Sequence, residues 1–285
     1  MVEEIIRSND LVGESPSWFE DERRLYWVSI PDGIIHRYDI DRELHERRQL
    51  PVYVSSIVPY QDGSAVITSG KGIYRFDFLD SKTHLIKEIV PWDIRNRMND
   101  AKCDPDGRLW IGFMNLSKDL PTGSLFVLDK SLNLKRVIDN LTVSNGLAWN
   151  AKSSEMYHID TPTCSVSIFS YHSSSLDIRK KGSIDLSAQK GRPDGMTIDD
   201  KGFLWVAMYN GAKVIRCDPR SREVVDSLDL PTPYITSCCF GGSNMNTLFI
   251  TSSNKPFEGK STNPYAGSLF AERLNVSGSK SYPFG

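Results

Sequence analysis

The chain has 285 residues, with 34 basic and 36 acidic side chains and a formal net charge of −2. Hydrophobic residues make up 39% and charged residues 25%, which is ordinary for a soluble globular protein. The balanced charge, without a long basic run, argues against a nucleic-acid partner, and no window approaches the roughly 18 apolar residues that a membrane helix needs.

The first predicted element is a short β-strand over residues 2–7. The first ten residues lack the basic start and long apolar core of a signal peptide, so we expect a cytoplasmic protein. The five cysteines form no Cys-x-x-Cys pair, which favours reduced, buried thiols over a disulfide framework.

A strand–turn–strand unit then recurs along the whole chain, and it is clearest at 193–207. Its second strand has six copies, centred on residues 26, 66, 110, 157, 205 and 249. Their spacing of 40 to 48 residues is typical of four-stranded propeller blades. We therefore predict an all-β fold, a six-bladed β-propeller forming a single domain over residues 1–285.

The ends of the chain are expected to close this ring. Only one clear strand, 267–274, follows the last repeat, so the N-terminal strand should complete the last blade. Such closure hides two sheet edges that would otherwise expose unpaired backbone groups.

Three irregular segments are candidates for contact with a ligand. The arginine-containing stretch 91–98 leads into the third repeat and is a candidate substrate loop. The stretches 112–122 and 253–264 are the longest irregular ones, and one or both are candidates to cap the channel.

Equivalent positions of successive repeats should lie on one ring around the channel. Counting back 11 or 12 residues from each strand centre selects Glu14, Ser55, Asn99, Asn145, Asp194 and Ser237 or Cys238. Two carboxylates on such a ring would repel each other and resist ionisation unless a cation lay between them. We therefore predict one divalent metal ion held by Glu14, Asn145 and Asp194, an all-oxygen set that suits Ca²⁺, Mg²⁺ or Mn²⁺ and tolerates Zn²⁺.

Other catalytic templates are absent from the sequence. There is no Gly-x-Ser-x-Gly elbow, no His-Glu-x-x-His motif and no phosphate-binding loop. His158 lies in a repeat strand and is interpreted as structural, and Cys238–Cys239 as a buried pair of small residues. Trp110 and Trp205 occupy equivalent positions and are assigned to the core between blades.

The ordered motifs of the chain resemble those of the family of senescence marker protein (regucalcin), gluconolactonase and luciferin-regenerating enzyme. They are Gly13-Glu14-Ser15-Pro16, Asn96-Arg97-Met98-Asn99-Asp100, Ser144-Asn145-Gly146-Leu147, Pro193-Asp194-Gly195-Met196 and Thr236-Ser237-Cys238-Cys239-Phe240. The resemblance implies a six-bladed propeller with one divalent ion, bound by residues matching Glu14, Asn145 and Asp194. It also implies that Arg97 and Asn99 contact sugar hydroxyls and that Asp194 acts as a base as well as a ligand.

One position departs from the family. Sugar lactonases of this family often carry a glutamate three residues after the methionine matching Met114, and Ser117 stands there instead. The identity of the lactone therefore stays open.

Together these observations predict a metal-dependent hydrolase that opens a sugar lactone, such as gluconolactone, xylonolactone or arabinolactone. Asp194 would be the general base and Arg97 and Asn99 the substrate-binding residues. Ca²⁺ and Zn²⁺ lead the metal candidates, followed by Mg²⁺, Mn²⁺ and Fe²⁺. The alternatives are a non-catalytic calcium-binding regulatory propeller and a promiscuous esterase or phosphotriesterase, and the expected assembly is a monomer or weak homo-oligomer.

Overall fold

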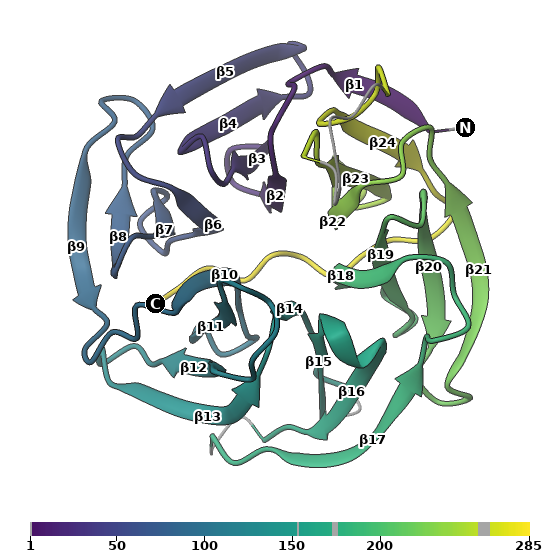
Figure 1. Ribbon diagram of the computed structural model, residues 1–285. Coiled ribbons are helices and arrows are strands. Elements are labelled where there is room, and N and C mark those ends of the chain that lie inside the picture. The colour runs from purple at the N-terminus through teal and green to yellow at the C-terminus, as the bar shows by residue number, and fades with distance from the viewer. Residues whose placement is uncertain (1, 153, 173–175, 256–262) are drawn as a thin grey trace.

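The computed structural model describes residues 2–152, 154–172, 176–255 and 263–285. Their 24 strands form six four-stranded antiparallel sheets arranged around a central channel (Figure 1). The predicted six-bladed β-propeller is therefore confirmed. No helix in this part of the chain is long and apolar enough to cross a membrane.

The strands run outward from the channel in sequence order within blades 1 to 5. Blade 1 contains β2 (Gly13–Phe19), β3 (Arg24–Ser29), β4 (Ile34–Asp39) and β5 (Leu44–Gln49), and blade 2 contains β6 (Val54–Pro59), β7 (Ala65–Ser69), β8 (Gly72–Phe76) and β9 (Thr83–Glu88). Blade 3 contains β10 (Asn96–Cys103), β11 (Leu109–Asn115), β12 (Gly123–Leu128) and β13 (Leu134–Leu141), and blade 4 contains β14 (Ser144–Asn150), β15 (Glu155–Asp160), β16 (Ser165–Ser170) and β17 (Arg179–Asp185). Blade 5 contains β18 (Arg192–Ile198), β19 (Leu204–Tyr209), β20 (Lys213–Asp218) and β21 (Glu223–Asp229). Blade 6 contains β22 (Ile235–Gly241), β23 (Thr247–Ser252), β24 (Leu269–Arg273) and β1 (Glu3–Ile6), and a short 3₁₀-helix, η1 (Thr161–Thr163), follows β15.

The hydrophobic core lies between the blades. The described residues form six buried apolar clusters, and each joins one pair of neighbouring blades around the ring. Trp110 and Trp205 are both almost fully buried in these clusters, as predicted. Second strands such as β7 and β11 are buried throughout, whereas the outermost strands β5 and β21 are largely exposed. The burial of apolar surface between sheets therefore holds the ring together.

The same pairing of an aspartate with a tryptophan stabilises a hairpin in blade 3 and in blade 5. This pairing explains why the hairpin can be predicted from sequence. The carboxylate of Asp104 accepts a hydrogen bond from the indole of Trp110 at 2.8 Å, and Asp199 accepts one from Trp205 at 3.1 Å. Both carboxylates also accept backbone N–H groups of their own turns. Each aspartate thus fixes a turn and anchors the tryptophan that packs against the next blade.

The N-terminal strand closes the last blade, as predicted. β1 pairs with β24 in antiparallel register, with Glu3 opposite Ala271 and Glu4 opposite Phe270. The carboxylate of Glu4 also accepts a hydrogen bond from the Ser268 hydroxyl at 2.7 Å. Strands from the two ends of the chain therefore share one sheet, which covers the edge of β24.

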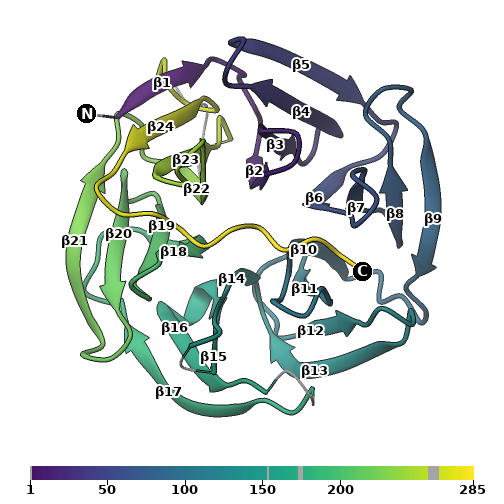
Figure 2. The ribbon, with the colours of Figure 1, turned by 180° about the vertical axis from the view of Figure 1, so that it is seen from behind.

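The C-terminal segment, residues 276–285, crosses one mouth of the channel, which the sequence did not predict. Figures 1 and 2 both show it passing over the centre of the ring. It is held by backbone hydrogen bonds from Ser279 to Ile198 and from Phe284 to Pro59, and by one from Gly285 to Gly107. Blades 5, 2 and 3 therefore all bind the segment.

The loop boundaries differ from the predicted ones. The expected irregular stretch 112–122 is shorter, because β11 continues to Asn115 and leaves only 116–122 as a loop. The reason is that Gly112, Phe113 and Met114 continue the inter-strand pairing of blade 3. Within the stretch 253–264, residues 256–262 lie outside the described residues.

Candidate functional site

Each inner strand carries a break in its pairing register near the same mouth of the channel. The breaks fall between Glu14 and Ser17, Val54 and Ser56, Met98 and Ala101, Asn145 and Leu147, Pro193 and Met196, and Ile235 and Ser237. A β-bulge of this kind bends the strand and redirects a side chain. The sequence analysis selected one position in each repeat for a ring around the channel, with Ser237 or Cys238 as the sixth. With Ser237 as the sixth, all six positions lie inside these bulges or directly beside them.

Glu14 is placed by an unusual backbone turn. Ser15, the first residue of its bulge, has a φ of 52°, a conformation that residues with side chains seldom adopt. The Ser15 N–H donates to Glu14 Oε2 at 2.8 Å, and the Ser15 hydroxyl accepts from the Ile57 N–H of the next blade at 3.0 Å. The carboxylate of Glu14 is thereby fixed at the channel, with 5% of the residue exposed.

A chain of hydrogen bonds crosses blades 3, 4 and 5. The side-chain amide of Asn99 donates to the backbone carbonyl of Ser144 at 2.9 Å and to Asn145 Oδ1 at 2.8 Å. The amide of Asn145 in turn donates to the Thr161 hydroxyl at 2.8 Å, and that hydroxyl donates to the Pro193 carbonyl at 2.9 Å. This chain fixes the Asn145 carbonyl oxygen and ties it to the residue before Asp194.

Blades 4 and 5 approach closely beside Asp194. A Cβ atom at Gly146 would lie 2.7 Å from the backbone oxygen of Asp194 and 2.9 Å from Met196 Cγ. Only glycine fits this contact, because real Cβ atoms do not approach backbone that closely. The glycine that follows Asn145 therefore allows the bulges of β14 and β18 to pack against each other.

Three carboxyl groups influence one another electrostatically in this buried region. Burial is the main cause that raises the pKa of Glu14 well above its usual value, and the charges of Asp100 and Asp194 raise it further. The pKa of Asp194 is likewise raised by burial and then by Asp100, while Lys118 and Arg97 oppose the change. Burial also raises the pKa of Asp100, to about 6. A site of this kind favours an added positive charge.

Arg97 supplies positive charge at the same place. Burial lowers the pKa of its guanidinium, and the nearby groups of Tyr53 and Glu14 act in the opposite direction. Among the described residues its only hydrogen bond runs from Nη1 to the backbone carbonyl of Met98, at 2.8 Å. The remaining N–H groups of Arg97 are therefore available to a ligand.

The predicted ligand set offers oxygens of the kind that divalent cations bind. In the described part of the chain, neither side-chain oxygen of Asp194 and only one of Glu14 accepts a hydrogen bond. No three His, Cys, Asp or Glu side chains among the described residues form a metal-binding group. The metal-ligand set predicted from equivalent positions of the repeats contains only two carboxylates, because its third ligand is the neutral carbonyl oxygen of Asn145. Such hard oxygen donors are those that Ca²⁺ and Mg²⁺ prefer.

Comparison with known proteins assigns this chain to a family. The family model described as SMP-30/Gluconolactonase/LRE-like region matches residues 12–254 of this chain. The chain belongs to this family. The family suggested by the sequence motifs is thus confirmed.

Individual family relatives match over nearly their whole length. An uncharacterised protein of Sulfolobus acidocaldarius is 43% identical, covering 94% of both chains. The putative sugar lactone lactonase YvrE of Bacillus subtilis is 35% identical, covering 96% of this chain and 95% of its own. The solved structure of a luciferin-regenerating enzyme superposes with a TM-score of 0.92 and 30% identity, covering 100% of this chain and 99% of the other.

Three charged residues near the family motifs escaped the sequence analysis. Asp100 follows Asn99 directly, and strict strand alternation would send it away from the channel, but the β10 bulge contains both residues. Lys102 lies further along β10, where its ammonium donates to the Met196 carbonyl at 2.7 Å. Lys118 lies on the loop 116–122, for which no periodic pattern exists. The motif Asn99-Asp100 was a signal that could have identified the first of them.

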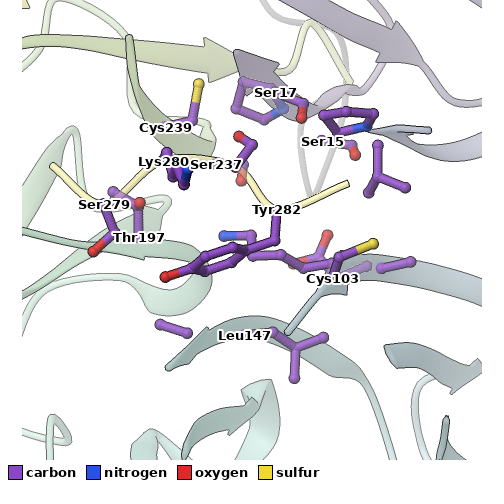
Figure 3. A pocket seen from close by; sticks show the side chains of 18 of the residues that line it. Ser15, Ser17, Cys103, Leu147, Thr197, Ser237, Cys239, Ser279, Lys280 and Tyr282 are labelled. Carbon is purple, nitrogen blue, oxygen red and sulfur yellow. The ribbon is translucent and has the colours of Figure 1, made fainter. Parts of the chain in front are cut away.

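A small cavity continues down the channel behind the site, with a volume of about 60 Å³ that can hold a few waters. Asp100 and Lys102 line it together with several hydroxyl groups, and the C-terminal segment closes its far end. Figure 3 shows the Tyr282 side chain projecting into this cavity. The site is therefore open to ligands mainly from the mouth that carries the bulges.

The remaining candidates from the sequence have structural surroundings. His158 is buried, and its Nε2 lies 2.8 Å from the Ser144 hydroxyl, which supports its interpretation as a structural residue. Cys238 and Cys239 are buried free thiols whose pKa values are raised chiefly by burial. A raised pKa suppresses the thiolate, so neither cysteine is suited to act as a nucleophile.

Proposed function

We propose that the protein is a metal-dependent lactonase that hydrolyses a sugar lactone to the corresponding sugar acid. The observation that carries this proposal is the pair of mutually repelling carboxylates with unused oxygens, Glu14 and Asp194, on the same ring of inner-strand bulges as the fixed carbonyl oxygen of Asn145. Family membership and the name of the Bacillus subtilis relative, a putative sugar lactone lactonase, support the same reaction.

Glu14, Asn145 and Asp194 would hold one divalent ion, with Ca²⁺ and Zn²⁺ as the leading candidates. When bound, such an ion polarises a carbonyl group and offsets the negative charge that develops on its oxygen. The hydrogen bonds from Asn99 to Asn145 and from Asn145 to Thr161 would keep the neutral ligand oriented before the ion arrives.

Asp194 is assigned as the general base. Its side chain has no hydrogen-bond donor among the described residues, and burial raises its pKa, which makes the carboxylate a stronger base. Asp194 would take a proton from the attacking water and return it to the ring oxygen as the C–O bond breaks. The products are one carboxylic acid and one hydroxyl group.

Arg97 and Asn99 are assigned to substrate binding, with different capacities. Arg97 has several unused N–H donors, so it would donate to sugar hydroxyls. Both amide hydrogens of Asn99 are already used, which leaves its Oδ1 to accept a hydrogen bond from the substrate. This polar surface favours a polyhydroxylated ligand over an apolar ester.

The test is acid release from gluconolactone, xylonolactone, arabinolactone and an aryl ester, followed in a pH-stat before and after metal depletion. We expect sugar lactones to be opened, chelation to abolish the activity, and the ion to restore it. Asp194→Asn removes both a proposed ligand and the base, so turnover should fall by at least the roughly 10²-fold to 10⁴-fold attributed to general-base catalysis. Asp119→Asn, on the exposed loop at the mouth, is the matched control and should retain activity.

The outcomes separate the competing functions. If the ion binds but no lactone is opened under any condition, the protein is a non-catalytic metal-binding propeller. If the aryl ester is preferred over every sugar lactone, the protein is an esterase instead. Full lactonase activity in Asp194→Asn would refute the assignment of the base.

A further inference from the structure

The bulge that carries Asp194 is held at both of its ends by side chains of other blades. The break in the register of β18 runs from Pro193 to Met196, so Asp194 lies between these two residues. The carbonyl of Pro193 accepts a hydrogen bond from the Thr161 hydroxyl, which follows β15 of blade 4, at 2.9 Å. The carbonyl of Met196 accepts one from the Lys102 ammonium of blade 3 at 2.7 Å. Two side chains therefore fix the short stretch of backbone that positions Asp194.

Neighbouring blades also enclose the backbone between these two carbonyls. A Cβ atom at Gly146 of blade 4 would lie 2.7 Å from the Asp194 carbonyl oxygen, and one at Gly195 would clash with Ser237 of blade 6. A closely packed interior of this kind transmits small displacements instead of absorbing them. A change at either fixed carbonyl should therefore move the Asp194 side chain.

The hydrogen bond from Lys102 joins two blades that are not neighbours. Lys102 lies on β10 in blade 3 and Met196 on β18 in blade 5, and β14 of blade 4 lies between these strands in the ring (Figure 1). Such a contact needs a long side chain with a donor at its tip, a combination that lysine and arginine provide. Both the length and the terminal donor of residue 102 are therefore used.

An ordinary ion pair does not explain the position of Lys102. In the described part of the chain its ammonium forms no ion pair, and the Met196 carbonyl is its one hydrogen-bond acceptor. Lys102 and Asp100 both line the cavity of about 60 Å³ behind the site. Burial raises the pKa of Asp100, and Lys102 is the first of the charges that oppose this rise. Lys102 thus adds a positive charge behind the carboxyl groups without direct contact with any of them.

Building on the proposed function, in which Asp194 is both ligand and base, we propose that Lys102 is a positioning residue for the Asp194 carboxylate. Its ammonium fixes the Met196 carbonyl and thereby the end of the bulge. Lys102 itself touches neither the ion nor the lactone. Its removal should therefore impair the placement of Asp194 and leave substrate binding through Arg97 intact.

The first experiment measures kcat and KM of Lys102→Met and Lys102→Arg for the best substrate among gluconolactone, xylonolactone and arabinolactone, with the ion at saturation. Lys102→Met keeps most of the side-chain length but removes the donor and its charge. We expect kcat to fall by about 10-fold to 100-fold, the range for a lost hydrogen bond to a charged group, with KM within about threefold of wild type. Lys102→Arg retains a charged donor, so its kcat should stay within about threefold of wild type.

Lys213 of blade 5 provides a matched control. Its ammonium also donates one hydrogen bond at 2.7 Å, to Gln189 Oε1, and like Lys102 it is half-buried. It lies on β20, two strands outward from the strand that carries Asp194. Lys213→Met should keep the kcat and KM of wild type. An equal loss of kcat in the two methionine variants would overturn the assignment of Lys102.

Hydrogen exchange tests the positioning without turnover. In Lys102→Met the amides of residues 192–198 should exchange at least about 10-fold faster than in wild type, while the inner strands of blades 1 and 2 keep their rates. Unchanged exchange at 192–198, or equal acceleration in every blade, would overturn the proposal. If Lys102→Met does not fold, Lys102→Gln replaces it with the same expected result, because it removes the ammonium but keeps a polar group in the cavity.

The two experiments separate this proposal from the proposed function. If the wild type opens no lactone but Lys102→Met accelerates exchange at 192–198, the lactonase function fails and the positioning role stands. If the wild type opens lactones and Lys102→Met has the same kcat, the lactonase function stands and the positioning role of Lys102 is refuted.

Discussion

Thr161 lies at the centre of the hydrogen-bond chain that orients Asn145, and its hydroxyl can be removed with little change of shape. In Thr161→Val the Asn145 amide loses its acceptor at 2.8 Å and the Pro193 carbonyl loses its donor at 2.9 Å. Each such bond contributes about 1 kcal/mol net to stability. Since the threonine is half-buried and water can replace part of the loss, we expect the free energy of unfolding to fall by about 1–2 kcal/mol.

The effect on metal binding should be larger than the effect on folding. Removing a group that orients a metal ligand typically lowers the affinity for the metal by about 10-fold to 100-fold. We therefore expect the dissociation constant for Ca²⁺ or Zn²⁺ to rise by that factor in Thr161→Val. The assay is calorimetric titration of chelator-treated protein, together with the shift in Tm at a fixed excess of the ion.

Thr163 provides a matched control on the same 3₁₀-helix. Its hydroxyl donates to the Asp160 carbonyl at 2.7 Å, but it is exposed and contacts no residue of the ligand set. Thr163→Val should leave metal affinity within about twofold of wild type. If Thr161→Val binds the ion as tightly as Thr163→Val, the hydrogen-bond chain has no role in positioning Asn145 and our reasoning is wrong.

Three further predictions concern the ring and its buried groups. Deleting residues 2–9 removes β1 and uncovers the edge of β24, so Tm should fall by several degrees; an unchanged Tm would show that closure adds nothing. Phe284→Ala should cost about 3–5 kcal/mol in denaturant unfolding, because this side chain is 2% exposed, whereas Lys280→Ala in the same segment should cost little. Burial lowers the pKa of His158 from 6.5 to about 3, so the unfolded chain binds a proton that the folded protein does not. The free energy of unfolding should therefore fall as pH falls from 6.5 towards 3, and His158→Gln should reduce that slope by up to about 1.4 kcal/mol per pH unit, measured by unfolding at several pH values.

The features that sequence could predict are those with a local cause. The hairpin unit is readable because Asp199 and Trp205 fix a turn and a core contact within a few residues of each other. The same phase in each repeat selected Glu14, Asn145 and Asp194, and the structure places all three at bulges of the inner strands. Their role as metal ligands stays a prediction.

The features that sequence could not predict depend on departures from regular geometry. Asp100 joins the site only because the bulge in β10 breaks the alternation of side chains. Lys118 lies in a loop whose left-handed backbone has no glycine to signal it. The C-terminal segment carries no periodic pattern, and its place across the channel depends on contacts with blades that are distant in sequence.

The central claim is that Glu14, Asn145 and Asp194 hold one divalent ion in the channel. The most direct test is the ion content of protein purified without chelator, combined with titration of the depleted protein, for wild type, Glu14→Gln and Asp194→Asn. We predict one ion per chain in the wild type and no stoichiometric binding in either variant. A wild-type protein that binds no divalent ion, or variants that bind it as tightly as wild type, would contradict the account.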